Sequence, residues 1–136
     1  MATVEDILMS KGPDVIVMSP LTTVQEAVML MCEANVGAVV IKRQDEVCGI
    51  FTERDLLRRV VVPGRAPERT ELHEVMTSPV RGVPLNTDVR ECGEILTREH
   101  LRHLAIIEND TLLGIVGLRD VLAWELAEDE RLLHHP

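Results

Sequence analysis

The sequence has almost no aromatic residues: it contains one Phe, one Trp and no Tyr among 136 residues. Stacking platforms for single-stranded nucleic acid are therefore missing. Basic residues are outnumbered as well, and the net charge of −9 disfavours binding of a nucleic-acid backbone by the whole surface. Apolar residues still make up 46% of the sequence, which predicts an aliphatic core of Val, Leu, Ile and Met.

Cysteine is scarce and lacks metal-binding spacing. Cys32, Cys48 and Cys92 include no CxxC pair, which argues against a disulfide framework or a zinc site and favours buried, reduced thiols. We expect no metal, because His100 and His103 have no third ligand at a suitable spacing. No apolar stretch approaches the roughly 18 residues of a membrane helix, and no signal-peptide pattern opens the sequence. We therefore expect a cytoplasmic protein with no membrane and no nucleic-acid partner.

Patterns typical of enzymes are also missing. The sequence has no GxGxxG, P-loop, GxSxG or HExxH pattern. No histidine can be paired with Cys32 or Cys48 from the sequence alone. We therefore expect that the chain is not an enzyme and carries no catalytic residues.

What the sequence does contain is an internal repeat. The segment Gly49-Ile50-Phe51-Thr52-Glu53-Arg54-Asp55 returns as Gly114-Ile115-Val116-Gly117-Leu118-Arg119-Asp120. The register holds without a gap from Thr22/Thr87 to Leu57/Leu122. Two copies of a unit too small for a good core of its own predict a pseudo-symmetric molecule with a cleft between the copies.

Both copies predict the order β-α-β-β-α after a short helical turn. The turns are expected at 4–9 and 71–76, and amphipathic helices begin near residues 24 and 89. Apolar runs predict strands covered on both faces. These strands are 36–41, 47–51, 104–107 and 112–116, with extended segments at 15–18 and 80–83. The last helix of each copy starts at Thr52 or Gly117, with expected buried stripes at Leu56, Leu57, Val60 and Val61 and at Leu118, Val121, Leu122 and Leu126.

A polar segment rich in Pro and Gly, 62–70, predicts the loop between the copies. We therefore expect a first repeat at 1–61, a second repeat at 71–130 and a C-terminal tail at 131–136. The fold class is α/β (α+β), with the two repeats packed in pseudo-two-fold symmetry.

The repeated segment resembles the motif of the cystathionine-β-synthase-type (CBS) domain pair. That motif is Gly, two apolar residues, Ser or Thr, two variable residues, and Asp at the start of the last helix. Gly49–Asp55 matches it fully, and Gly114–Asp120 matches except at Gly117. The resemblance covers essentially the whole chain. It implies a stand-alone regulatory module that binds AMP, ADP, ATP or S-adenosylmethionine, forms a homodimer and modulates an unknown partner protein. No other cofactor is required.

The resemblance also implies that each cleft combines the Asp motif of one repeat with residues of the other repeat. Asp55 would accept hydrogen bonds from the ribose hydroxyls, and Thr52 would donate to phosphate at a helix N-terminus. The partner residues of this first cleft would be Val83, Thr87, Arg102 and His103. The second cleft would combine Asp120 with Thr22, Gly37 and Ala38, and without a hydroxyl or a basic pair we expect it to be weak or empty.

A second hypothesis stays open, in which the chain is an interaction scaffold that binds no ligand. Thr52 and Asp55 would then only cap a helix, because Thr-x-x-Asp is close to a capping box. The loss of the hydroxyl at Gly117 motivates this alternative. Trp124 suits dimer packing and core packing equally well.

Overall fold

The computed structural model describes residues 1–12 and 15–134, which belong to two compact units. One unit, Val15–Val80, carries Asp55 and is called the Asp55 unit. The other combines the first helix of the chain with the segment that begins at Arg81, and is called the Asp120 unit. Helices and strands occur in both units, so the predicted mixed α/β class is confirmed.

The Asp55 unit is built on a three-stranded sheet in the order β1-β2-β3. The first pair of strands is parallel and the second is antiparallel, with Val40 opposite Ile50. Its strands are β1 (Val17–Met18), β2 (Ala38–Arg43) and β3 (Glu46–Thr52). Its helices are α2 (Val24–Ala34), α3 (Glu53–Asp55), the π-helix η1 (Leu56–Val61), the 3-10 helix η2 (Pro67–Arg69) and α4 (Leu72–Val75).

The Asp120 unit repeats this arrangement with a sheet in the order β4-β5-β6. Its strands are β4 (Gly82–Val83), β5 (His103–Glu108) and β6 (Thr111–Gly117). Its helices are α1 (Val4–Lys11), α5 (Val89–Arg98) and α6 (Leu118–His134). The predicted order of elements therefore holds in both copies, with strand ends that differ from the sequence prediction by one or two residues.

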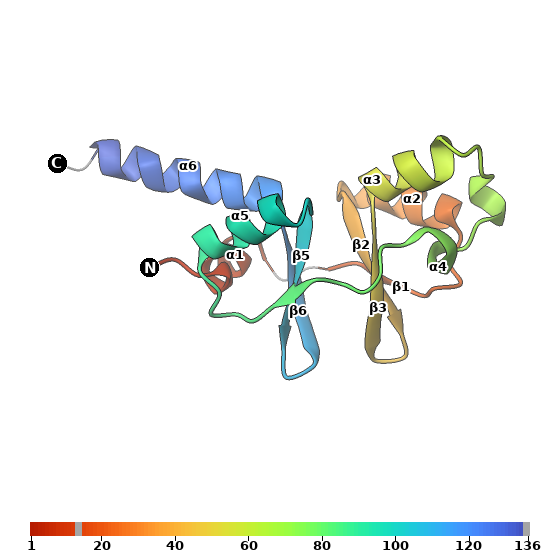
Figure 1. Cartoon of the computed structure of the whole chain (residues 1–136), viewed down its shortest axis with the longest axis horizontal. Coiled ribbons are helices and arrows are strands. Elements are labelled where there is room, and N and C mark those ends of the chain that lie inside the picture. The colour runs from red at the N-terminus through yellow and green to blue at the C-terminus, as the bar shows by residue number, and fades with distance from the viewer. Residues whose placement is uncertain (13–14, 135–136) are drawn as a thin grey trace. The chain divides into compact units, whose positions relative to one another are not determined.

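The leading helices are exchanged between the repeats. Helix α1 precedes the Asp55 unit in the sequence but lies with α5 and α6 (Figure 1). It contacts β6 and α6, and the Val4 N–H donates to the Thr87 carbonyl at 2.8 Å. In the Asp55 unit, the Leu72 N–H at the start of α4 donates to the Thr22 carbonyl at 2.9 Å. The repeats predicted at 1–61 and 71–130 are defined by the internal repeat of the sequence. Each compact unit instead joins one repeat's sheet to the leading helix of the other repeat.

The glycine that opens each motif makes room for the exchanged helix. A Cβ on Gly114 would lie 2.6 Å from Leu8 Cδ2, which is closer than real contacts allow. A Cβ on Gly49 would meet the Met76 sulfur and would lie 3.1 Å from the Thr77 carbonyl. The first position of the repeated motif is therefore a packing surface for a helix that is distant in sequence.

Each unit has its own apolar core. The core of the Asp55 unit includes Val24, Val39, Ile41, Phe51, Val60, Leu72 and Val75. The core of the Asp120 unit includes Val4, Leu8, Val89, Cys92, Leu96, Leu104, Ile106 and Val121. Trp124 is half-buried and packs against the latter core. Among the thiols only that of Cys92 is buried, so the prediction of buried cysteines is wrong for Cys32, which is exposed.

The last helix of each repeat buries less than its sequence predicted. Val60 and Val121 are buried, but Leu57, Val61, Leu122 and Leu126 are 58%, 60%, 49% and 66% exposed. The expected stripes are wrong at these four positions, because each helix covers its unit with a single line of side chains. Helix α6 also continues to His134, beyond the repeat boundary predicted at residue 130, while residues 135–136 of the predicted tail lie outside the described residues.

Among the described residues, no helix combines the length and apolar character that crossing a membrane requires.

Replacing Leu8 by Ala tests the exchange of the leading helices. Leu8 is 7% exposed, so its truncation is expected to lower the free energy of unfolding by about 2–5 kcal/mol. Met9 on the same helix is 80% exposed, so Met9→Ala should leave that free energy nearly unchanged. Urea unfolding of both variants measures the difference. Equal, small effects would contradict the packing of α1.

Candidate functional site

The predicted ligand residues Thr52 and Asp55 form a reciprocal cap at the start of α3. The Asp55 N–H donates to Thr52 Oγ1 at 3.2 Å, and Asp55 Oδ2 accepts from the Thr52 N–H at 3.0 Å. The Thr52 hydroxyl donates to the same carboxylate oxygen at 3.1 Å. Asp55 is only 6% exposed. The motif is therefore a buried capping box in which Asp takes the place of the usual Glu.

The other oxygen of Asp55 is held from outside the motif. Thr77, just after α4, donates its hydroxyl to Asp55 Oδ1 at 2.9 Å. Arg59 lies with Nε 3.8 Å from the same oxygen, and its Nη1 donates to the Met76 carbonyl at 2.6 Å. Arg59 is thus paired with a nearby carboxylate. The carboxylate of Asp55 connects the start of α3 to the end of α4.

Two residues predicted for the second cleft lie beside Thr52 within the Asp55 unit. Ala38 pairs with Thr52 across β2 and β3, and the Gly37 carbonyl accepts from the Glu53 N–H at 3.0 Å. Thr22 contributes its carbonyl to the start of α4. The start of β2 and the start of α3 therefore belong to one local structure.

The corresponding carboxylate in the Asp120 unit has different partners. Asp120 Oδ2 accepts from the Gly117 N–H at 2.8 Å and from the Lys11 ammonium at 2.8 Å. Lys11, the last residue of α1, also donates to the Ile115 carbonyl at 3.0 Å. The Asp120 side chain is 29% exposed. This motif has a charged donor from α1 in place of a threonine hydroxyl.

The predicted basic pair stands at the start of β5. His103 is half-buried and pairs with Gly117 across β5 and β6. Arg102 is exposed, and its backbone carbonyl accepts a hydrogen bond from the Leu118 N–H at 2.8 Å. A Cβ on Gly117 would lie 3.2 Å from His103 Cδ2 and 3.4 Å from the Arg102 carbonyl oxygen. A side chain at position 117 would therefore crowd His103, which would have to shift by a few tenths of an ångström.

The remaining predicted residues, Val83 and Thr87, are buried in the Asp120 unit. Val83 pairs with Ile106, and the Thr87 hydroxyl donates to the Pro84 carbonyl at 2.7 Å. A cleft that joins them and the basic pair to Thr52 and Asp55 involves both units, and it stays a prediction.

Sequence reasoning missed Thr77 and Lys11. Each lies far along the chain from the aspartate that it contacts, at the end of an exchanged helix. No local pattern marks such a contact. Arg59, in contrast, stands four residues after Asp55 on one helix, and that spacing is a usable signal for an ion pair.

Cys92 has none of the features of a reactive thiol. Burial, together with the negative charges of Glu91 and Asp88, raises the pKa of its thiol to about 11. A thiol with a raised pKa is largely protonated near neutral pH, so it is a poor nucleophile.

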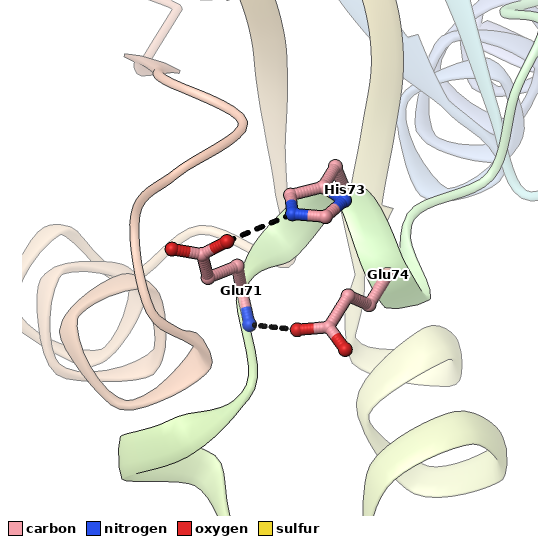
Figure 2. A group of neighbouring side chains, drawn as sticks. All are labelled: Glu71, His73 and Glu74. Atoms are coloured by element: carbon pink, nitrogen blue, oxygen red, sulfur yellow. Dashed lines mark hydrogen bonds and ion pairs between the residues drawn. The ribbon is translucent and has the colours of Figure 1, made fainter.

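A group of potential metal ligands stands at the start of α4, where Glu71, His73 and Glu74 have candidate ligand atoms within 4.8 Å of one another (Figure 2). Glu74 accepts from the Glu71 N–H at 2.8 Å, and His73 Nε2 lies 2.8 Å from Glu71 Oε1. The Glu71 N–H and the Arg65 guanidinium hold the pKa of the Glu74 carboxyl below its usual value. These bonds describe a capped helix start, and we assign it no metal.

Alanine substitution of the two aspartates tests the difference between the motifs. Asp55→Ala leaves buried donors without a partner and should lower the free energy of unfolding by about 1–3 kcal/mol. Asp120→Ala removes a more exposed ion pair and should cost about 1 kcal/mol or less. Urea unfolding compares the two. A larger loss in Asp120→Ala would show that the burial of Asp55 is unimportant.

The sequence is similar to that of known proteins with CBS domains. The profile of the CBS domain matches residues 4–62 and 72–127. The chain is 32% identical to the CBS domain-containing protein YhcV of Bacillus subtilis, with 95% of this chain and 89% of YhcV covered. It is 38% identical to the uncharacterized protein MK0525 of Methanopyrus kandleri over 82% of this chain, and it spans only 58% of that relative.

Solved structures show the same fold. A protein with CBS domains from Burkholderia ambifaria, assigned to signal transduction, superposes with a TM-score of 0.88 at 31% identity, covering 93% of this chain and 95% of that one. A hexameric CBS-CP12 protein from bloom-forming cyanobacteria gives a TM-score of 0.82 at 26% identity, covering 90% of this chain and 71% of that one. With two profile matches over most of its length and relatives above 30% identity, the chain belongs to the CBS domain family as a domain pair.

Proposed function

We propose that this CBS domain pair is a sensor that binds an adenosine-containing ligand at Asp55 and modulates a partner protein. CBS domain pairs are in general regulatory modules. The observation that carries the proposal is the buried carboxylate of Asp55 at a helix start, next to a threonine hydroxyl. The proposed ligands are AMP, ADP, ATP and S-adenosylmethionine.

The chemistry of the motif suits such a ligand. A carboxylate accepts hydrogen bonds from both hydroxyls of a ribose, and hydrogen bonds to a charged acceptor are strong. Asp55 supplies this acceptor. The Thr52 hydroxyl, which caps Asp55 in the ligand-free protein, becomes a donor to phosphate once the ribose occupies the carboxylate. Capping and ligand binding are then two uses of the same groups.

The second repeat completes the proposed site. We propose that the basic side chains of Arg102 and His103 attract a phosphate and that Val83 and Thr87 line the base or ribose. The motif at Asp120 lacks the threonine hydroxyl, and Lys11 already pairs with its carboxylate. We therefore propose one working cleft, at Asp55, and one weak or empty cleft formed by Asp120 with Thr22, Gly37 and Ala38.

Thermal unfolding of nucleotide-free protein tests the proposal. AMP, ADP, ATP, NAD and S-adenosylmethionine are added in turn to the wild type and to Asp55→Ala and Asp120→Ala. Ligand at about 100 times its Kd stabilises the folded protein by roughly 2.7 kcal/mol, which raises the midpoint by several degrees. We expect a shift with one of these ligands that Asp120→Ala keeps and Asp55→Ala loses.

Two outcomes would count against this proposal. A shift retained in Asp55→Ala but lost in Asp120→Ala would place the working site at the other motif. The absence of any shift at millimolar ligand would favour the scaffold hypothesis.

Exposed apolar side chains favour a second role, assembly into a homodimer. Leu57, Val61, Leu122 and Leu126 occupy equivalent positions on the last helices of the two repeats, and each is about half exposed or more. Burying such side chains in an interface removes apolar area from water. The assembly of the hexameric CBS-CP12 relative supports association of copies. A homodimer is compatible with both the sensor and the scaffold.

Replacing Leu57 and Leu122 together by Glu tests the homodimer. Charges at both positions are expected to halve the mass in solution, because a buried unpaired carboxylate is costly. Light scattering after gel filtration measures the mass. Met9→Glu, at a position 80% exposed on α1, is the control and should keep the wild-type mass. An unchanged mass in the double variant would exclude these helices from the interface.

A further inference from the structure

The end of each exchanged helix delivers a hydrogen-bond donor to the aspartate of the motif. In the Asp55 unit the donor is the hydroxyl of Thr77, which follows α4 and lies 2.9 Å from Asp55 Oδ1. In the Asp120 unit it is the ammonium of Lys11, at the end of α1, 2.8 Å from Asp120 Oδ2. In both units the motif aspartate thus accepts a hydrogen bond from the end of the exchanged helix, but the donor is neutral in one unit and positively charged in the other.

The carboxylate of Asp55 has little acceptor capacity left. Two carboxylate oxygens offer about four lone-pair positions. Oδ2 accepts both the N–H and the hydroxyl of Thr52, and Oδ1 accepts the hydroxyl of Thr77 while Arg59 lies 3.8 Å away. A ribose with two hydroxyls therefore competes with a donor of the protein for at least one oxygen.

In the proposed site the Thr52 hydroxyl leaves Oδ2 for the phosphate, so one ribose hydroxyl takes that place and the other competes with Thr77 for Oδ1. Thr77 can yield without movement of the backbone. Its N–H and carbonyl are fixed by two hydrogen bonds to Ile50, at 2.8 and 3.0 Å. The hydroxyl, in contrast, changes its direction by rotation of the side chain alone. A neutral hydroxyl is also a weaker donor than the ammonium that Lys11 offers to Asp120.

We propose that Thr77 is a specificity-determining residue that sets how strongly Asp55 binds a vicinal diol. Its hydroxyl occupies Asp55 Oδ1 in the ligand-free protein and is displaced when a ribose binds. This inference rests on the proposed function, because it presumes that Asp55 takes the ribose of a nucleotide. Thr77 acts through Asp55 and needs no contact of its own with the ligand.

Removing the hydroxyl of Thr77 tests the inference. Thr77→Val has nearly the same shape, so calorimetric titration with AMP is expected to show binding tighter than wild type by about tenfold or more. Thr77→Ser keeps the donor and should bind as the wild type does. The probe 2′,3′-dideoxy-AMP has no diol and should bind the wild type and Thr77→Val equally.

Thr70→Val is the matched control. Thr70 is 3% exposed in the same unit, and its hydroxyl donates to the Ala66 carbonyl at 2.8 Å. This variant should lose stability, as Thr77→Val does, without any change in AMP affinity.

The outcomes separate the inference from the function on which it rests. Tighter AMP binding in Thr77→Val alone, or binding seen only in that variant, supports the inference. If the wild type binds AMP and Thr77→Val binds it no tighter, the inference is wrong and the proposed function stands. A gain shared with Thr70→Val or with the dideoxy probe also overturns it. If neither the wild type nor Thr77→Val binds AMP, ADP, ATP or S-adenosylmethionine, both proposals fail.

Discussion

The exchange of leading helices is the constraint on which the rest of the molecule depends. Helix α1 closes the core of the Asp120 unit through Leu8, and α4 closes the core of the Asp55 unit through Leu72. Neither sheet has a complete apolar cover from its own repeat. The motif glycines, Gly49 and Gly114, leave space for these helices. The first residue of the motif thus allows a helix to pack closely, and the last provides a carboxylate that accepts hydrogen bonds.

The exchange also brings the ends of these helices to the aspartates. Thr77 reaches Asp55 and Lys11 reaches Asp120 because α4 and α1 end beside the motif helices. The two copies diverge around this common plan. One motif has a buried carboxylate held by neutral hydroxyls, and the other has a more exposed carboxylate paired with an ammonium. In the second copy His103 lies close to position 117, where the motif has glycine in place of threonine. The two motifs therefore differ in burial and in the charge of the donors around their carboxylates.

Much of the fold was predictable, because it depends on local periodicity and on the repeat. The register from Thr22 to Leu57 gave two equal sheets, and the Thr52 and Asp55 cap followed from spacing within one turn. The exchange of helices was not predictable, since the periodicity of 4–9 predicts an apolar face without specifying which sheet that face covers. The exposure of Leu122 was also missed, because periodicity shows that a helix has an apolar face without showing what covers it. Finally, η1 is a π-helix, whereas α6, which follows the motif of the other repeat, is an α-helix. The sequence pattern does not indicate this difference.

The shared helices also determine how this chain can be divided. A cut in the loop 62–70 separates the repeats as the sequence defines them, yet it removes α4 from the sheet that α4 covers. A fragment from Val15 to Val80 retains every element of one core. The remaining unit then consists of two separate pieces of chain, which must associate to restore the other core. The unit of duplication in the sequence and the compact unit of the structure therefore differ by one helix. A chain with a single repeat would lack the helix that covers its own sheet and could complete its core with the helix of a second copy.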